Sequence, residues 1–147
     1  MLRAEVSTKI KRPVEEVFAV ISDASKDERW ISSVSETTQT SDGPIGEGTT
    51  WHSVSKFLGR RMEMDITYTE FEPNRRLAFD MTGPFPVTMA FTFEPESDGT
   101  RVVQVVDAEP GGFFRIVGPL LVAAAKRQFQ NDLDNLRDLM EADALGD

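Results

Sequence analysis

Few residues in this chain are of a type that does chemistry. His52 is the only histidine, and the chain has no cysteine. A lone histidine cannot by itself supply a three-ligand metal site or a serine–histidine–aspartate arrangement, and a chain without cysteine has no thiol nucleophile. Strand alternation places His52 on the face opposite Trp51, which favours an outward position. We therefore expect no metal, no cofactor and no dedicated catalyst.

Two uncharged polar residues fall on faces that are otherwise apolar. Tyr68 shares its face with Met64 and Ile66, and Gln104 shares the alternate positions of residues 100–108. A few polar groups in an apolar pocket orient a ligand, and a buried tyrosine or glutamine needs a hydrogen-bond partner. The partner is either a ligand or the protein's own backbone and water.

Alternating and helical apolar patterns predict the elements that position these residues. Residues 2–10 alternate as a half-buried strand. Pro13 begins a first short helix, and Asp23 caps a second one that reaches Trp30. Trp30 then either closes the mouth of a cavity or joins this helix to the sheet. Short turns separate the strands that follow, which favours an antiparallel meander. These strands are expected at residues 34–40, 49–58, 62–68, 77–81, 87–93 and 101–109.

A long C-terminal helix follows the strands. From about Phe113 one apolar stripe recurs at helical spacing. Its members are Leu121, Val122, Ala125, Phe129, Leu133, Leu136 and Met140. Asp132 and the other charged residues of this helix are expected on its surface. The preceding segment 110–119 is either a hinged lid or a plain connector, and Pro119 either kinks the helix or starts its regular part. Packing the stripe on the apolar sheet face gives a single α+β domain over residues 1–147.

Composition excludes several classes of function. The chain has 147 residues and a net charge of −9, so it repels the phosphate backbone of nucleic acids. No apolar stretch approaches the roughly 18 residues of a membrane span, and residues 1–9 lack the pattern of a signal peptide. We expect a cytoplasmic protein, monomeric or homodimeric.

Several short motifs occur in an order that resembles the helix-grip family, also called START-like or SRPBCC, and its polyketide cyclase/dehydrase-type subgroup. The stretches are residues 10–18 (IKRPVEEVF), 23–30 (DASKDERW), 46–49 (GEGT), 71–73 (FEP), 76–79 (RLAF), 93–95 (FEP) and 99–102 (GTRV). The resemblance implies a curved seven-stranded antiparallel sheet, with two short helices after its first strand, that grips the long helix. It also implies a cavity for lipids, polyketides or other apolar ligands.

The expected function is therefore binding of a small apolar or aromatic ligand between sheet and helix. A cyclase, aromatase or dehydratase is the alternative, with Tyr68, Gln104 or a buried acid assisting proton transfer. A role in serving a protein partner is a third hypothesis. The candidate ligand-binding residues are Trp30, Trp51, Met62, Met64, Tyr68, Phe79, Met89, Phe91, Gln104, Phe114, Leu121 and Phe129. No convincing inward acid–base pair is visible in the sequence.

Overall fold

The computed structural model describes residues 2–57, 59–83, 86–108 and 112–145, and the side chains of residues 57, 112–117 and 121 lie outside the described part. The chain begins with strand β1 (Leu2–Ile10), helix α1 (Val14–Ser22) and the 3₁₀ helix η1 (Ala24–Arg29). Six strands and a long helix follow. They are β2 (Val34–Gln39), β3 (Thr50–Phe57), β4 (Arg60–Glu72), β5 (Arg76–Thr82), β6 (Val87–Glu96), β7 (Gly99–Ala108) and α2 (Gly112–Glu141).

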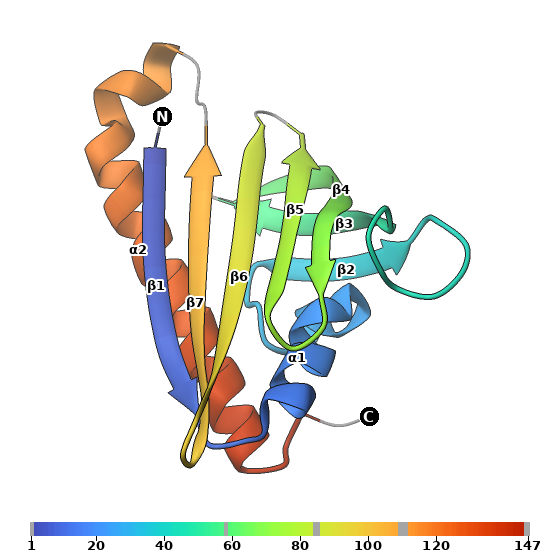
Figure 1. Ribbon diagram of the computed structural model, residues 1–147. Coiled ribbons are helices and arrows are strands. Elements are labelled where there is room, and N and C mark those ends of the chain that lie inside the picture. Colours follow the sequence, from blue (N-terminus) through green and yellow to red (C-terminus); the bar gives the residue numbers. More distant parts are fainter. Residues whose placement is uncertain (1, 58, 84–85, 109–111, 146–147) are drawn as a thin grey trace.

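The strands form one seven-stranded antiparallel sheet in the order β1-β7-β6-β5-β4-β3-β2. The sheet is curved. Helix α2 lies along β1 and β7, and α1 lies farther toward the side of the sheet formed by β2 to β5 (Figure 1). β2 to β6 each pair with the next strand in sequence, and the first strand, β1, pairs with the last, β7. This arrangement confirms the predicted helix-grip architecture, including the two short helices after the first strand.

The alternation read from the sequence holds along most strands. In β1, the buried positions are Ala4, Val6, Thr8 and Ile10, and in β7 they are Thr100, Val102, Gln104 and Val106. In β4 the parity changes at Thr69, because the register between β4 and β5 shifts between Tyr68 and Glu70. One extra residue in a strand turns every later side chain to the other face. Phe71 therefore points inward, where its ring packs edge-on against Phe18 at 5.2 Å between centroids.

Helix α2 begins at Gly112, so Pro119 lies inside the helix and does not start it. The C-terminal half of α2 fills the core: Leu133 and Leu136 are fully buried, and Met140 is nearly so. The N-terminal half presents Val122, Ala125 and Phe129, which are only partly buried. The two halves of one apolar stripe thus meet different surroundings.

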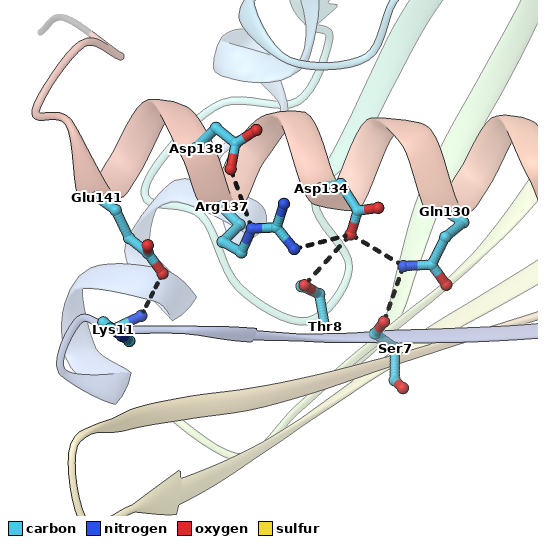
Figure 2. Close-up of polar contacts among 8 residues, drawn as sticks. All are labelled: Ser7, Thr8, Lys11, Gln130, Asp134, Arg137, Asp138 and Glu141. Atoms are coloured by element: carbon cyan, nitrogen blue, oxygen red, sulfur yellow. Dashed lines mark hydrogen bonds and ion pairs between the residues drawn. The ribbon is translucent and has the colours of Figure 1, made fainter.

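Polar contacts hold the C-terminal half of α2 against β1 (Figure 2). The Gln130 side chain donates to the Ser7 carbonyl oxygen at 2.9 Å, and the Lys11 backbone N–H donates to Glu141 at 2.9 Å. Asp134 accepts from Gln130 at 3.0 Å and from Thr8 at 3.4 Å. These bonds run along the edge where helix and strand meet, so they fix the helix at the end of the domain that has the filled core.

Candidate functional site

A cavity of about 270 Å³ lies between the concave sheet face and the N-terminal half of α2. Its walls come from β1, η1 and the segment that follows it, β2 to β7, and α2. Four methionines line it, namely Met62, Met64, Met81 and Met89. Unbranched thioether side chains adapt to irregular ligands, so this lining suits an apolar molecule of variable shape.

The cavity exists because the inward stripe of α2 changes size along the helix. Leu133 and Leu136 occupy the space over the sheet at one end, whereas Ala125 and Val122 line the cavity at the other. A small side chain at position 125 leaves volume that a leucine would fill. The helix therefore leaves the interior open at one end while it closes the other.

Seven of the predicted site residues line this cavity. They are Trp30, Met62, Met64, Phe79, Met89, Gln104 and Phe129. Tyr68 and Phe91 line a smaller adjacent pocket of about 30 Å³, called the lobe below, whose walls share Asp27, Trp30 and Met89 with the cavity. Phe114 and Leu121 belong to α2, and their side chains lie outside the described part of the structure, as do residues 110 and 111 of the predicted lid.

Trp51 is a core residue and does not line the cavity. It is 2% exposed, and its ring lies 5.9 Å from that of Tyr68 between centroids. Tyr68 in turn lies 5.6 Å from Phe79, which does line the cavity. Trp51 therefore supports the wall through Tyr68 instead of forming it.

The Tyr68 hydroxyl is satisfied by the protein itself. It donates to the Ser22 carbonyl oxygen at 2.8 Å, which ties β4 to the end of α1. Burial, together with the carboxyls of Asp27 and Asp23, raises the pKa of Tyr68 far above its ordinary value. The hydroxyl therefore stays protonated at any physiological pH and acts as a hydrogen-bond donor that links β4 to α1.

Replacing Tyr68 by phenylalanine should cost stability and leave binding intact. The Ser22 carbonyl would lose its buried donor, which costs about 1–3 kcal/mol of unfolding free energy. The affinity for any cavity ligand should change by less than about twofold, well below the tenfold that 1.4 kcal/mol would produce. Urea denaturation and calorimetric titration measure the two effects. Loss of binding with unchanged stability would instead assign the hydroxyl to the ligand.

Gln104 lies inward, as strand parity predicts, and is 4% exposed. Its Nε2 donates to the Met89 Sδ at 3.3 Å, and no described residue donates to its Oε1. A thioether is a weak acceptor. Gln104 is therefore a polar wall residue that the protein satisfies only in part.

Trp30 lies deep in the interior and does not close a mouth. It is 2% exposed, and its carbonyl oxygen accepts from the Asn135 Nδ2 at 3.1 Å. The described residues include no acceptor for its indole Nε1. The residue joins η1 to the sheet and to α2, which is the second of the two roles expected from the sequence.

Asp132 corrects the expectation of a surface carboxylate. It is 5% exposed and lines the cavity. Its carboxyl accepts from the Ser32 backbone N–H and hydroxyl, each at 3.2 Å, and from Gln128 at 3.1 Å. Burial raises its pKa, while these donors oppose the rise. The spacing of residues 125, 129 and 132 already placed it on the inward stripe, but its charge argued for the surface.

Asp27 is the second inward acid that sequence reasoning missed. It is a η1 residue that lines both the cavity and the smaller lobe. Protein surrounds its carboxyl, and this desolvation, followed by the charge of Asp23, raises its pKa well above the ordinary value. The residue nevertheless keeps some exposed surface, and the cavity is the space it faces. The 3₁₀ geometry of η1 turns this acid inward between the exposed Glu28 and Ser25.

Replacing Asp27 by asparagine should raise stability at neutral pH but not at low pH. The folded pKa of Asp27 lies above the unfolded value of about 3.9, so between the two the folded state binds more protons and loses stability as pH rises. Asparagine does not titrate, so the gain of the variant over the parent should grow from pH 4 to pH 8 by at least about 1 kcal/mol.

Urea denaturation of both proteins at the two pH values measures this gain. Glu28→Gln, which removes an exposed acid of the same short helix, should show no such change. A gain of equal size at both pH values would mean that Asp27 titrates normally.

His52 lies on the outer face of the sheet, as parity predicts. Its ring nitrogens contact Asp65 Oδ1 at 2.9 Å and Glu63 Oε1 at 3.1 Å, and these bonds raise its pKa. Neither His52 nor these acids line the cavity. The described residues contain no group of three or more potential metal ligands.

A sheet that curves around a long helix, with an apolar cavity between the two, defines the class of helix-grip ligand-binding folds. The chain belongs to the family described as polyketide cyclase / dehydrase and lipid transport, whose model matches residues 1–141. The search among curated proteins finds no significant match. Within the described residues, no helix has the length and hydropathy of a membrane span.

Solved structures share this fold at low sequence identity. TTHA0849 from Thermus thermophilus is 20% identical, with a TM-score of 0.83 over 97% of this chain and 99% of that one. A START superfamily protein from Mycobacterium smegmatis is 14% identical, with a TM-score of 0.81 over 97% and 99%. The Zhui aromatase/cyclase from a Streptomyces species is 14% identical, with a TM-score of 0.78 over 95% and 93%.

Proposed function

We propose that this protein binds one small apolar or aromatic molecule in the cavity between the sheet and α2. The cavity itself carries the proposal, because its walls are mostly aliphatic, aromatic and thioether side chains. An apolar cavity of about 150 Å³ holds benzene, so about 270 Å³ suits a ligand with two rings or an equivalent chain. Burial of roughly 300 Å² of such a ligand contributes about 7 kcal/mol before association costs, which favours micromolar affinity.

An enzyme that uses the same cavity is the second candidate function. Asp27 favours it, because a carboxyl whose pKa is raised by burial and that lines the cavity can exchange a proton with a bound molecule. The family description includes cyclases and dehydrases, and the Streptomyces protein of the same fold is an aromatase/cyclase. Tyr68 does not support this candidate, because its hydroxyl is already committed to Ser22.

Native mass spectrometry of protein purified without detergent tests the proposal. We expect a one-to-one adduct, either with a compound that co-purifies and can be extracted or with added ethylnaphthalene. Turnover of the extracted compound would then identify an enzyme, and its recovery unchanged would identify a carrier or sensor. Absence of both adducts would refute the proposal. A single domain over residues 1–147, a cytoplasmic location and a monomeric or homodimeric state stay predictions of the sequence.

A further inference from the structure

The inner end of the cavity contains one acid that the protein does not satisfy. Among the described residues no hydrogen bond lowers the pKa of Asp27, and its one charged neighbour of influence is the like-charged Asp23. Asp132, the other acid of the walls, accepts from Ser32 and Gln128. Asp27 is only partly buried and lines the cavity, so a molecule that enters the cavity can supply a hydrogen-bond partner to its carboxyl.

The lobe beside Asp27 accepts only a small group. Its volume is about 30 Å³, and its walls include the rings of Tyr68, Phe79 and Phe91. The Tyr68 proton is engaged by Ser22, so Asp27 is the group that meets a ligand there. A second unsatisfied polar atom, the indole Nε1 of Trp30, belongs to the same walls. The lobe therefore suits one polar heavy atom at the end of an apolar body.

Charge in the walls selects against an anionic end group. Of the two basic lining residues, Arg3 forms a 2.7 Å ion pair with Asp107, and Lys56 is exposed. A ligand carboxylate in the lobe would meet Asp27, while the walls of the larger cavity add Asp132, and no basic residue among those described lines the lobe. The cost of placing a second negative charge there grows with burial. A hydroxyl fits the geometry better, because it carries no charge and can either donate to the Asp27 carboxyl or accept from it.

We propose that the ligand is a neutral alcohol or phenol whose hydroxyl enters the lobe and hydrogen-bonds the Asp27 carboxyl, and that carboxylates of the same shape are rejected. This inference rests on the proposed function, since it names the end group of the molecule that the cavity binds. The apolar body occupies the methionine-lined cavity, and the hydroxyl lies between η1 and β4.

Calorimetric titration at pH 7 with four compounds of one naphthalene body tests the end group. The compounds are ethylnaphthalene, naphthaleneethanol, naphthaleneacetate and naphthaleneethylamine. We expect the alcohol to bind and the acetate to bind at least about tenfold more weakly. The preference for alcohol over hydrocarbon should fall about fivefold or more in Asp27→Leu, because leucine keeps the bulk and removes the partner.

Two further variants make the test independent of folding. Asp27→Asn keeps a hydrogen-bonding side chain, so its affinity for the alcohol should stay close to that of the parent. Because asparagine carries no charge, its affinity for the acetate should be higher than that of the parent. Glu28→Gln, on the exposed side of the same short helix, should behave as the parent. Thermal denaturation shows whether each variant is folded before titration.

The possible outcomes test the ligand's end group separately from the proposed binding in the cavity. Binding of the hydrocarbon without a preference that Asp27 controls, or equal binding of the acetate, would overturn the hydroxyl assignment and leave the proposed function standing. Tightest binding of the amine with release of a proton would replace the hydroxyl by a cation. Failure of all four compounds would overturn the proposed function together with this inference.

Discussion

Replacing Ala125 by tryptophan should abolish ligand binding without unfolding the protein. Ala125 lines the cavity from α2, so an indole at this position occupies space that a ligand needs. A ligand that loses only about 60 Å² of buried apolar area loses about 1.4 kcal/mol, a tenfold loss of affinity. An indole that occupies the cavity should remove much more of the ligand's buried area, and so more of its binding free energy. Titration should therefore detect no binding at micromolar concentrations.

The neighbouring position provides a matched control for this prediction. Ala124 lies on the same helix but is exposed and does not line the cavity, so Ala124→Trp should bind as the parent does. The stability of Ala125→Trp separates a cavity from a packed core, because overpacking a filled core costs about 1–3 kcal/mol. Unchanged affinity in Ala125→Trp, or a large loss of stability, would contradict the placement of the binding site.

The substitution with the largest expected effect on stability is Gly99→Ala in the turn between β6 and β7. A methyl group at this position would overlap the backbone carbonyl oxygen of Ile10 and lie 2.9 Å from the Lys11 Cα. Both obstacles are backbone atoms where β1 turns toward α1, so neither moves easily. We expect a loss of about 2–4 kcal/mol in the free energy of unfolding.

Gly46→Ala is the control for the glycine prediction. A methyl group there meets no atom within 4 Å, so stability should change by less than about 0.5 kcal/mol. Urea denaturation of both variants measures the difference. If Gly99→Ala is as stable as Gly46→Ala, the turn and the end of β1 are not packed as closely as the structure shows.

The fold could be predicted from the alternating and helical spacing of apolar residues in the sequence. In β1 and β7 every second residue is buried, and the inward position of Gln104 follows from that alternation alone. The helical spacing of Leu133, Leu136 and Met140 predicts the buried stripe of α2 equally well. These patterns are reliable because one face of each element must leave water, and that requirement is periodic.

The division between core and cavity could not be read from the same patterns. Trp51 and Met64 both point inward from neighbouring strands, yet Trp51 packs in the core while Met64 lines the cavity. Which inward residue meets empty space depends on what the helix places opposite, and no single-strand pattern records that. The same limit explains why Tyr68, although buried, serves the Ser22 carbonyl and not a ligand.

The two acids were missed for different physical reasons. Asp132 falls on the apolar stripe, but a charged residue is exposed in most proteins, and two of its three donor groups belong to Ser32, distant in sequence. Asp27 belongs to a six-residue 3₁₀ helix, which is too short for a periodic signal to assign its faces. Its inward direction depends on how η1 packs against the sheet, which is a tertiary property.

Methyl NMR of protein with labelled methionines tests the central claim most directly. Met62, Met64, Met81 and Met89 line the cavity, whereas Met140, near the C-terminal end of α2, is buried in the core and does not line it. Titration with naphthaleneethanol should shift the four cavity methyl signals to saturation at one equivalent and leave the Met140 signal in place. Unshifted cavity signals alongside binding detected by calorimetry, or an equal shift at Met140, would contradict a binding site between the sheet and the N-terminal half of α2.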